Sequence, residues 1–249
     1  MSSENKHIKE LGHALEPFAV STVLAGEIIT FSKTSKKIKF ILAGKDFDSE
    51  KYKEEVVIYE DQLKRSPEKI KALVLSKLQA NKTIYARNCE VRKIDKETAV
   101  NFLENYHLMN STQSGFNFGL FYLDELVAVA SFSKGRKMNR LREDQRSFEL
   151  IRFCCKSGIT ITGGLSKLIK NFCEEKKAGD VMTYVDKDLS DGTSFIRAGF
   201  KKHSETEATY FLVNRVTFER NMATKDELYD AKKFYRIKNS GNVKLVYTP

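Results

Sequence analysis

Short apolar runs alternate with polar stretches along the first eighty residues. The runs Glu27–Phe31, Lys37–Leu42 and Val56–Tyr59 are rich in β-branched and aromatic residues, which is typical of strands. Ser66 and Pro67 then favour a helix start, because serine caps helices and proline fits the first helical position. The pattern predicts a small α/β domain in this part of the chain.

The pattern from about residue 81 onward predicts a larger mixed sheet. Runs with helical spacing follow Asp95 and the pair Gly163-Gly164. The expected strands are Thr83–Val91, Phe116–Tyr122, Leu126–Phe132, Ser147–Cys155, Asp180–Val185 and Thr209–Val213, with a short helix at Ser194–Ala198. This order predicts the fold class α/β (α+β), a mixed sheet with flanking helices. We expect domains at 1–80 and 81–216 and a basic C-terminal tail at 217–249.

The composition is that of a globular protein with a basic excess. Hydrophobic residues make up 41% and charged residues 31%, and Lys and Arg outnumber Asp and Glu by 43 to 33. The net charge of +10 favours a polyanionic partner such as DNA, with ordinary solubility as the alternative. No apolar run is long enough to span a membrane and Met1–Glu10 is polar, so we expect a cytoplasmic protein.

The four cysteines form no C-x-x-C pair. A zinc ribbon needs two such pairs to place four thiolates around the metal, so we expect no structural zinc. Cys154 and Cys155 are adjacent in an apolar stretch and are expected to be reduced, buried thiols.

From about Arg87 to Val216 the chain resembles the GNAT acetyltransferase superfamily. The resemblance rests on the strand Phe148–Phe153, a glycine turn before a helix, and a short helix closed by Gly199-Phe200. It implies that the turn, Thr162, Gly163, Gly164 and Leu165, holds the pyrophosphate of acetyl-CoA or a related acyl-CoA through backbone N–H groups at a helix N-terminus. A plain tight connection is the alternative. The superfamily's general-acid tyrosine falls on Phe195, so another group protonates the thiolate or no acyl transfer occurs.

A phage version of this domain is a closer resemblance. Phe102–Leu108 is similar to its Asn-His motif, and Tyr184–Gly192 to its Tyr-x-Asp-x-x-x-Ser-x-Gly loop. The resemblance implies functional roles for His107, Asp186 and Ser190, since histidine can accept a proton from an amine near neutrality. The alternatives are a helix-terminal histidine and a loop-capping aspartate. Where the family has two arginines and a tryptophan, this chain has Lys187, Asp188 and Leu189.

Stretches outside that domain resemble phage homing endonucleases with a Vsr-like, restriction-enzyme-like nuclease. They are Ile58–Leu63, Ile84–Val91 and Phe234–Tyr247. The resemblance places the family's metal-binding aspartate and glutamate on Thr30 and Ile41, neither of which can replace a carboxylate on a hard cation. It places the histidine on Asp48 and leaves an acidic position at Glu4. We therefore expect a degenerate nuclease, with Mg²⁺ bound only if nuclease activity remains.

An acidic loop in the same region is a second candidate metal site. Asp46, Asp48 and Glu50 could hold a cation, although a solvated loop is the favoured interpretation. No metal site is therefore predicted.

Basic clusters supply the expected DNA contacts, which are Lys134, Arg136, Lys137, Arg140 and Arg236. Three hypotheses follow. The first is a DNA-associated protein of a phage or mobile element, in the host cytoplasm, whose GNAT-like domain binds or modifies DNA. The second is an active homing endonuclease, and the third is an N-acetyltransferase that uses acetyl-CoA. The sequence specifies no oligomeric state.

Overall fold

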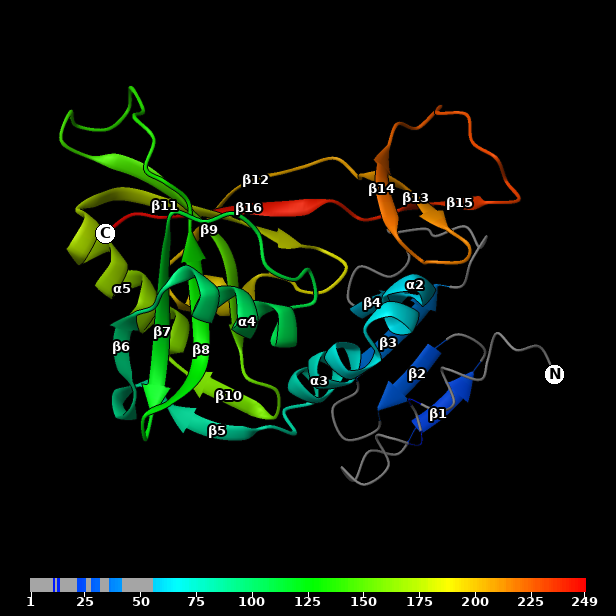
Figure 1. The fold of residues 1–249 in the computed structure, drawn as a ribbon, viewed down its shortest axis with the longest axis horizontal. Coiled ribbons are helices and arrows are strands. Elements are labelled where there is room, and N and C mark those ends of the chain that lie inside the picture. Colours follow the sequence, from blue (N-terminus) through cyan, green and yellow to red (C-terminus); the bar gives the residue numbers. More distant parts are fainter. Residues whose placement is uncertain (1–10, 12, 14–21, 26–27, 32–35, 42–55) are drawn as a thin grey trace. The chain divides into compact units, whose positions relative to one another are not determined.

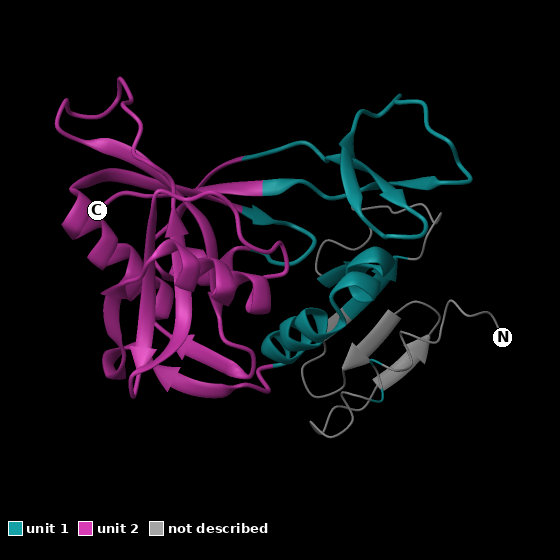
Figure 2. Cartoon of the chain, viewed as in Figure 1, with its two compact units in different colours: residues 1–78, 185–191, 205–242 teal, residues 79–184, 192–204, 243–249 magenta. Residues whose placement is uncertain are grey.

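The computed structural model describes residues 11, 13, 22–25, 28–31, 36–41 and 56–249. Contacts within the chain define two compact units, coloured separately in Figure 2. The first comprises residues 1–78, 185–191 and 205–242, and the second comprises 79–184, 192–204 and 243–249. This grouping differs from the three consecutive ranges expected from the sequence, because the chain returns to the first unit twice after leaving it.

Among its described residues, the first unit contains a four-stranded sheet followed by the helices α2 (Glu60–Arg65) and α3 (Pro67–Lys77) (Figure 1). Its strands, in spatial order, are β1 (Thr22–Ala25), β2 (Ile28–Phe31), β3 (Lys36–Ile41) and β4 (Val56–Tyr59). Pro67 occupies the helix start predicted for it, at the beginning of α3. The pairing is antiparallel except between β3 and β4, which are parallel.

A three-stranded sheet completes the first unit. Its order is β14 (Arg220–Ala223), β13 (Tyr210–Asn214) and β15 (Phe234–Lys238). Buried side chains from β13 and β15 share one core with those of β3 and β4: Ile41, Val57, Tyr59, Val213, Tyr235 and Ile237. Segments far apart in the sequence therefore form one hydrophobic core.

The second unit is built on a seven-stranded mixed sheet (Figure 1). The spatial order is β12 (Lys201–Glu205), β16 (Asn242–Tyr247), β11 (Ala178–Asp186), β9 (Arg146–Cys155), β8 (Glu125–Phe132), β7 (Phe116–Tyr122) and β6 (Glu90–Lys93). Its helices are α4 (Lys96–Tyr106), α5 (Gly164–Lys176) and α6 (Thr193–Arg197). The predicted fold class, a mixed sheet with flanking helices, is confirmed.

Helices α4 and α5 cover opposite faces of this sheet. On α4, Phe102 and Leu103 pack with Val129 of β8. On α5, Phe172 stacks on Phe132 of the same strand, with ring centroids 3.7 Å apart. Positions 129 and 132 point to opposite faces because side chains alternate along a strand. Both faces are thus buried, which explains the long apolar runs of β8 and β9.

Two expectations about strands require correction. The expected strand Thr83–Val91 is two strands, β5 (Lys82–Tyr85) and β6, separated by a 3₁₀ turn at Ala86–Asn88. Thr209–Val213 was expected to end the large sheet, but β13 pairs in the three-stranded sheet instead.

The last strand of the large sheet comes from the expected tail. Strand β16 lies between β11 and β12. Its Val243 and Leu245 are buried while Lys244 between them is not, and this period of two is that of a strand with one apolar face.

Candidate functional site

Strands β9 and β11 start as a parallel pair and then separate. The ladder joins Ala178–Met182 to Arg146–Glu149, and within this fully described part of the chain it goes no further. At the point of separation the Thr183 hydroxyl, rather than a backbone group, donates to the Leu150 carbonyl at 2.9 Å. The two strands therefore form a fork, defined here as Leu150–Cys155 on one arm and Thr183 and Tyr184 on the other, all in the second unit.

A β-bulge lies in β9 at the start of the fork. Phe132 of β8 pairs with Leu150, but its neighbour Ser131 pairs with Arg152, so Ile151 is the extra residue. Residues 151–155 are half-buried, whereas Phe148 and Leu150 before the bulge are buried. The bulge bends β9 and leaves its edge accessible.

An open fork can bind an extended chain that contains amides. Each arm has backbone N–H and C=O groups that a strand ladder would otherwise use. A ligand with alternating donors and acceptors can pair with such edges, as an added strand does. The geometry therefore suits a linear amide better than a compact ligand.

A glycine turn follows the fork at the start of α5. Gly163 has φ +79°, a left-handed conformation that favours glycine. Gly164 is buried, and a Cβ there would lie 2.9 Å from Ile161 Cγ2 and 3.1 Å from Leu120 Cδ1. Backbone conformation therefore explains the glycine at 163, and close packing explains the glycine at 164. Both reasons agree with the alternative that this turn is only a tight connection between strand and helix.

The same turn also presents donors to an anion. The first N–H groups of α5 have no carbonyl partner within the helix, and the helix dipole adds partial positive charge there. Thr162 and Gly163 are exposed, whereas Leu165 is buried. Lys167, one turn further, is engaged elsewhere: its Nζ donates to the carbonyls of Ala86 and Cys89. Anion binding at this turn would therefore depend on backbone groups.

Arg152 connects the bulge to the loop after α4. Its guanidinium donates to the Asn110 carbonyl at 3.1 Å and to the Ile151 carbonyl at 3.0 Å. Burial lowers the pKa of Arg152, and the negative charge of Glu149 opposes this shift. Glu149 thus lies close enough to influence Arg152 at the base of the fork, where the two strands separate.

His107 caps the C-terminal end of α4, in the second unit. Its Nδ1 accepts the backbone N–H of Met109 at 3.1 Å. That nitrogen would have to lose this bond before it could take a proton. The predicted catalytic role of His107 remains a prediction.

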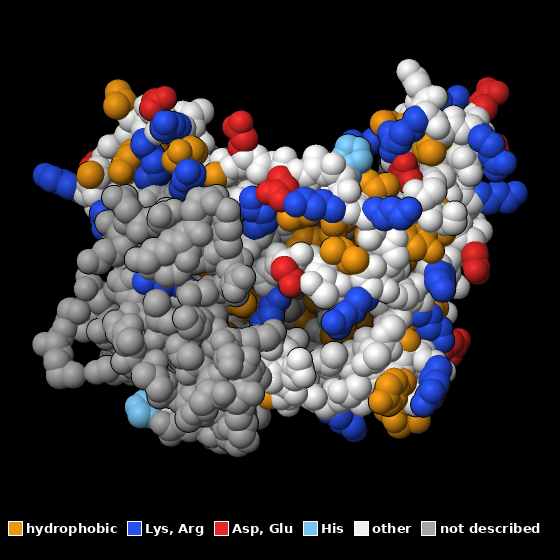
Figure 3. Space-filling view, turned by 180° about the vertical axis from the view of Figure 1, so that it is seen from behind, with side chains coloured by type: hydrophobic (Ala, Val, Ile, Leu, Met, Phe, Trp, Pro, Cys, Tyr) orange, Lys and Arg blue, Asp and Glu red, His pale blue; other side chains and the backbone are white. Residues whose placement is uncertain are grey.

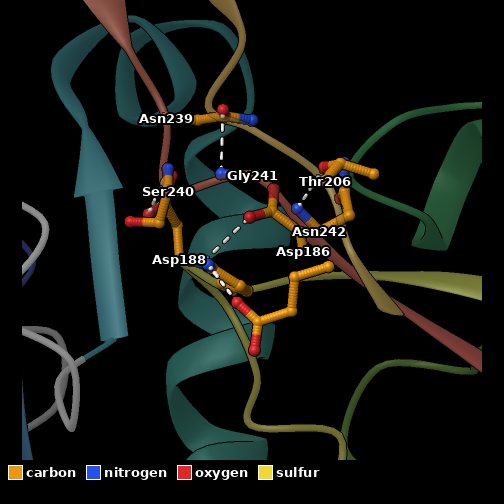
Figure 4. Close-up of polar contacts among 9 residues, drawn as sticks. Asp186, Asp188, Thr206, Asn239, Ser240, Gly241 and Asn242 are labelled. Atoms are coloured by element: carbon orange, nitrogen blue, oxygen red, sulfur yellow. Dashed lines mark hydrogen bonds and ion pairs between the residues drawn. The ribbon is translucent and has the colours of Figure 1, made fainter. Parts of the chain in front are cut away.

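Asp186 ends β11 and Ser190 lies in the turn after it, both in the first unit. Figure 4 shows the contact between Asp186 and Asp188. The Ser190 N–H donates to the Asp186 carbonyl at 3.0 Å, and the Asp188 N–H donates to the Asp186 carboxylate at 2.9 Å. Burial raises the pKa of Asp186 to about 6, and the charge of Asp188 adds to the shift. The carboxylate thus holds the loop, and its predicted catalytic role is not tested by this geometry.

Asp188 is a polar centre that the sequence reasoning missed. It is buried, accepts the Tyr59 hydroxyl at 3.2 Å and the Ser240 N–H at 3.2 Å, and burial raises its pKa. The Tyr59 hydroxyl also lies 2.8 Å from the Lys238 carbonyl. Because these partners are 52 and 129 residues away, no local pattern could have identified them.

The five predicted DNA-contacting residues differ in whether their side chains are engaged within the chain. Lys134, Arg136 and Lys137 are exposed on the loop between β8 and β9. Arg140 donates to the buried Asp180 at 2.5 Å, and Arg236 donates to the carbonyls of Lys225 and Glu227. Lys and Arg side chains on the face drawn in Figure 3 are interspersed with acidic ones. Two of the five predicted contacts therefore have structural roles.

The two described positions of the predicted nuclease site, Thr30 and Ile41, supply no carboxylate. Ile41 is buried in the core of the first unit, and Thr30 lies in β2. Glu4, Asp46, Asp48 and Glu50 lie outside the described residues. Among the residues that are described, no three His, Cys, Asp or Glu side chains are grouped to hold a metal ion.

The cysteines form no disulfide in the structure, and its described helices are short. All four cysteines are free thiols, with Cys89 and Cys173 buried and the expected buried pair, Cys154 and Cys155, half-buried. Within the described chain, no helix has the length and apolar character needed to cross a membrane.

Comparisons with known proteins found structural likeness only. No protein-family model matches the chain, and no curated protein matches it. An acetyl-CoA-bound GNAT family acetyltransferase from Elizabethkingia anophelis is 11% identical, with 65% of this chain and 99% of that chain covered and a TM-score of 0.37. A Bacillus subtilis acetyltransferase in complex with CoA is 12% identical, with 65% and 99% covered and a TM-score of 0.37. We draw nothing from scores this low.

The larger sheet has the element order that the sequence predicted. Helix α4, the hairpin β7–β8, strand β9, the glycine turn with α5, strand β11 and helix α6 follow one another as the sequence predicted. The final strand of that order is supplied by β16.

Proposed function

We propose that this protein is an acyl-CoA-dependent N-acyltransferase whose GNAT-like sheet binds the thioester in the fork between β9 and β11. One observation carries the proposal: the chain runs from the bulged arm β9 through the short strand β10 (Ile159–Thr162) to a glycine turn at a helix N-terminus, and that helix leads into β11, the other arm of the fork. Coenzyme A has the matching chemistry, an extended arm with two amides and a pyrophosphate. The fork suits the arm, and the turn suits the anion.

The reaction requires little further machinery. The amine nitrogen attacks the thioester carbonyl carbon, the C–N bond forms, the C–S bond breaks, and the amine loses a proton. Glu149 beside the bulge is the carboxylate that we assign to accept this proton. Phe195 packs against Phe200 and has no proton to give. The departing thiolate takes its proton from water.

A charge placed in the first turn of α5 tests this site. Ser166 is half-buried at the third helical position, where a glutamate is compatible with the helix dipole. Ser166→Glu would repel the pyrophosphate, whereas Ser166→Gln has the same size without the charge. We expect Ser166→Glu to weaken acetyl-CoA binding about tenfold or more, close to 1.4 kcal/mol, in titration calorimetry. Equal affinities for the two variants would reject the proposed anion site.

A DNA-associated role is a second candidate. The exposed Lys134, Arg136 and Lys137 favour it, because they lie on one loop and could follow a phosphate backbone. We expect binding to duplex DNA to weaken with salt and to lose about three units of log–log salt slope when all three are changed to Gln. The variant Lys201→Gln, exposed on β12, is the control. An unchanged slope would contradict this role.

The relation to phage homing endonucleases also remains a proposal. It is supported by the sequence strings of Ile58–Leu63, Ile84–Val91 and Phe234–Tyr247. The buried Ile41 in place of a metal-binding carboxylate favours a nuclease that has lost activity. Mg²⁺-dependent nicking of plasmid DNA by the purified protein would contradict that loss.

A further inference from the structure

A small cavity lies at the base of the fork, within the second unit. Its volume is about 130 Å³, and its lining includes Ser133, Arg136, Arg140, Glu149, Met182 and Lys244. Glu149 and Met182 form the last pair of the β9–β11 ladder. The cavity therefore starts where the two strands separate, and its size suits a small polar group rather than a polymer.

The position of Glu149 in this cavity is fixed by its backbone. Its N–H donates to the Ser133 hydroxyl at 2.9 Å, and its carbonyl accepts the Ser133 N–H at 2.9 Å. Both contacts hold β9 against the end of β8 just before the bulge at Ile151. A carboxylate from a rigid strand thus faces the cavity beside the place assigned to the thioester.

The charges around the cavity leave a positive excess. Arg140 is neutralised by Asp180, which is buried and also accepts the Ser147 hydroxyl. Arg136 and Lys244 form no ion pair with any described residue. Two cations therefore face one carboxylate, Glu149, and an anionic group that enters the cavity would be stabilised.

We infer that this cavity selects the acceptor of the acyl group, and that the acceptor is a small amine bearing a carboxylate, such as a free amino acid. Arg136 and Lys244 bind the carboxylate, and Glu149 accepts the proton of the amine. The inference rests on the proposed acyl-CoA function. In the reaction the amine nitrogen bonds to the acyl carbon of an acyl-CoA, the thioester C–S bond breaks, and the products are an N-acyl amino acid and the free thiol of coenzyme A.

Matched acceptors test this inference. Purified protein and acetyl-CoA are mixed with glycine, with glycinamide, which lacks the carboxylate, or with the polycation spermidine, and the free thiol is measured. We expect kcat/KM for glycine to exceed that for glycinamide or spermidine by at least about tenfold, the effect of one charge-assisted contact. Equal values for glycine and glycinamide would overturn the inference.

Variants locate the selectivity in the cavity. We expect Arg136→Gln and Lys244→Gln each to raise KM for glycine without changing KM for glycinamide or the affinity for acetyl-CoA, and Arg136→Lys to restore part of the loss. Lys137→Gln, exposed on the same loop outside the cavity lining, is the control. Equal effects on both acceptors would overturn the assignment.

A separate measurement of acetyl-CoA binding distinguishes failure of the proposed acyl-CoA function from failure of the inferred acceptor selectivity. Failure of the wild-type protein to bind acetyl-CoA in titration calorimetry would remove the proposed function and the inference together. Binding and transfer without preference for a carboxylate would overturn the inference alone.

Discussion

At the scale of single residues, carboxylates with little exposure to solvent hold parts of the first unit together. The half-buried Asp186 accepts the Asp188 N–H, and the buried Asp188 accepts the Ser240 N–H. Asp61 is buried as well, and Arg220 donates to both of its carboxylate oxygens, at 2.5 and 3.1 Å. These charges connect β4, the loop after β11 and the three-stranded sheet of the first unit. Their removal should therefore alter stability rather than acyl-CoA affinity.

Asp186 gives a pH-dependent prediction. Its folded-state pKa of about 6 lies above the ordinary value near 3.9, so the folded protein holds the proton more tightly than the unfolded chain. The stability that this group contributes is present below about pH 4 and is lost as the pH rises through about 6, by up to about 3 kcal/mol. Asp186→Asn, followed by urea unfolding from pH 4 to 7, should lose this decline. Exposed Asp144→Asn should keep it, and identical curves for both variants would contradict the prediction.

The Arg220–Asp61 pair gives a second residue-scale prediction. Arg220→Met leaves a carboxylate that is 2% exposed without its cation, which should destabilise the protein by about 3 kcal/mol. The exposed pair Arg92–Glu90 is the control, and Arg92→Met should leave the free energy of unfolding nearly unchanged, because solvent screens this pair. Urea titrations measure both. A similar small loss in the two variants would mean that Asp61 is solvated.

At the scale of elements, the sequence predicted the helices and most strands but not the site geometry. The order from α4 to α6 followed from apolar periodicity and the Gly163-Gly164 turn. The fork and the bulge at Ile151 did not, because they depend on how far two strands pair and not on residue type. Strand β16 has the alternation of a half-buried strand but was assigned to a tail, since its partners β11 and β12 are distant in sequence.

The glycine turn gives the element-scale prediction. Gly163 and Gly158 have nearly the same positive φ, +79° and +77°, and a Cβ at either has room. Gly163→Ala and Gly158→Ala should each cost about 1 kcal/mol of stability from backbone strain. Only Gly163→Ala, at the start of α5, should also weaken acetyl-CoA binding. If the two variants bind acetyl-CoA with equal affinity in calorimetry, the turn at Gly163 does not contact the ligand.

At the scale of the whole molecule, the chain contributes to each compact unit in several passes. Residues 205–242 leave the large sheet to form the three-stranded sheet, and the last residues return as β16. Because of this path, the C-terminal residues form an interior strand of the large sheet, although they lie at the end of the sequence. The same path also explains why the three consecutive domains expected from the sequence differ from the two compact units, each of which combines several separate segments of the chain.

Burial along β16 gives the matching prediction. Leu245 is 1% exposed, and Leu245→Ala should cost about 3 kcal/mol through lost burial and the resulting cavity. Val216→Ala, at a position that is 84% exposed, should change the free energy of unfolding by less than about 0.5 kcal/mol. Chemical denaturation of both variants measures the difference. An unaffected Leu245→Ala variant would mean that β16 does not belong to the sheet in solution.

Hydrogen exchange with and without acetyl-CoA tests the central claim most directly. If the ligand lies along the fork with its pyrophosphate at α5, added acetyl-CoA should slow amide exchange at Ile151–Cys155, at Thr183 and Tyr184, and at Gly164–Ser166. Strand β14 in the other unit should exchange at the same rate in both states. Unchanged exchange along both arms of the fork at saturating acetyl-CoA would contradict the account.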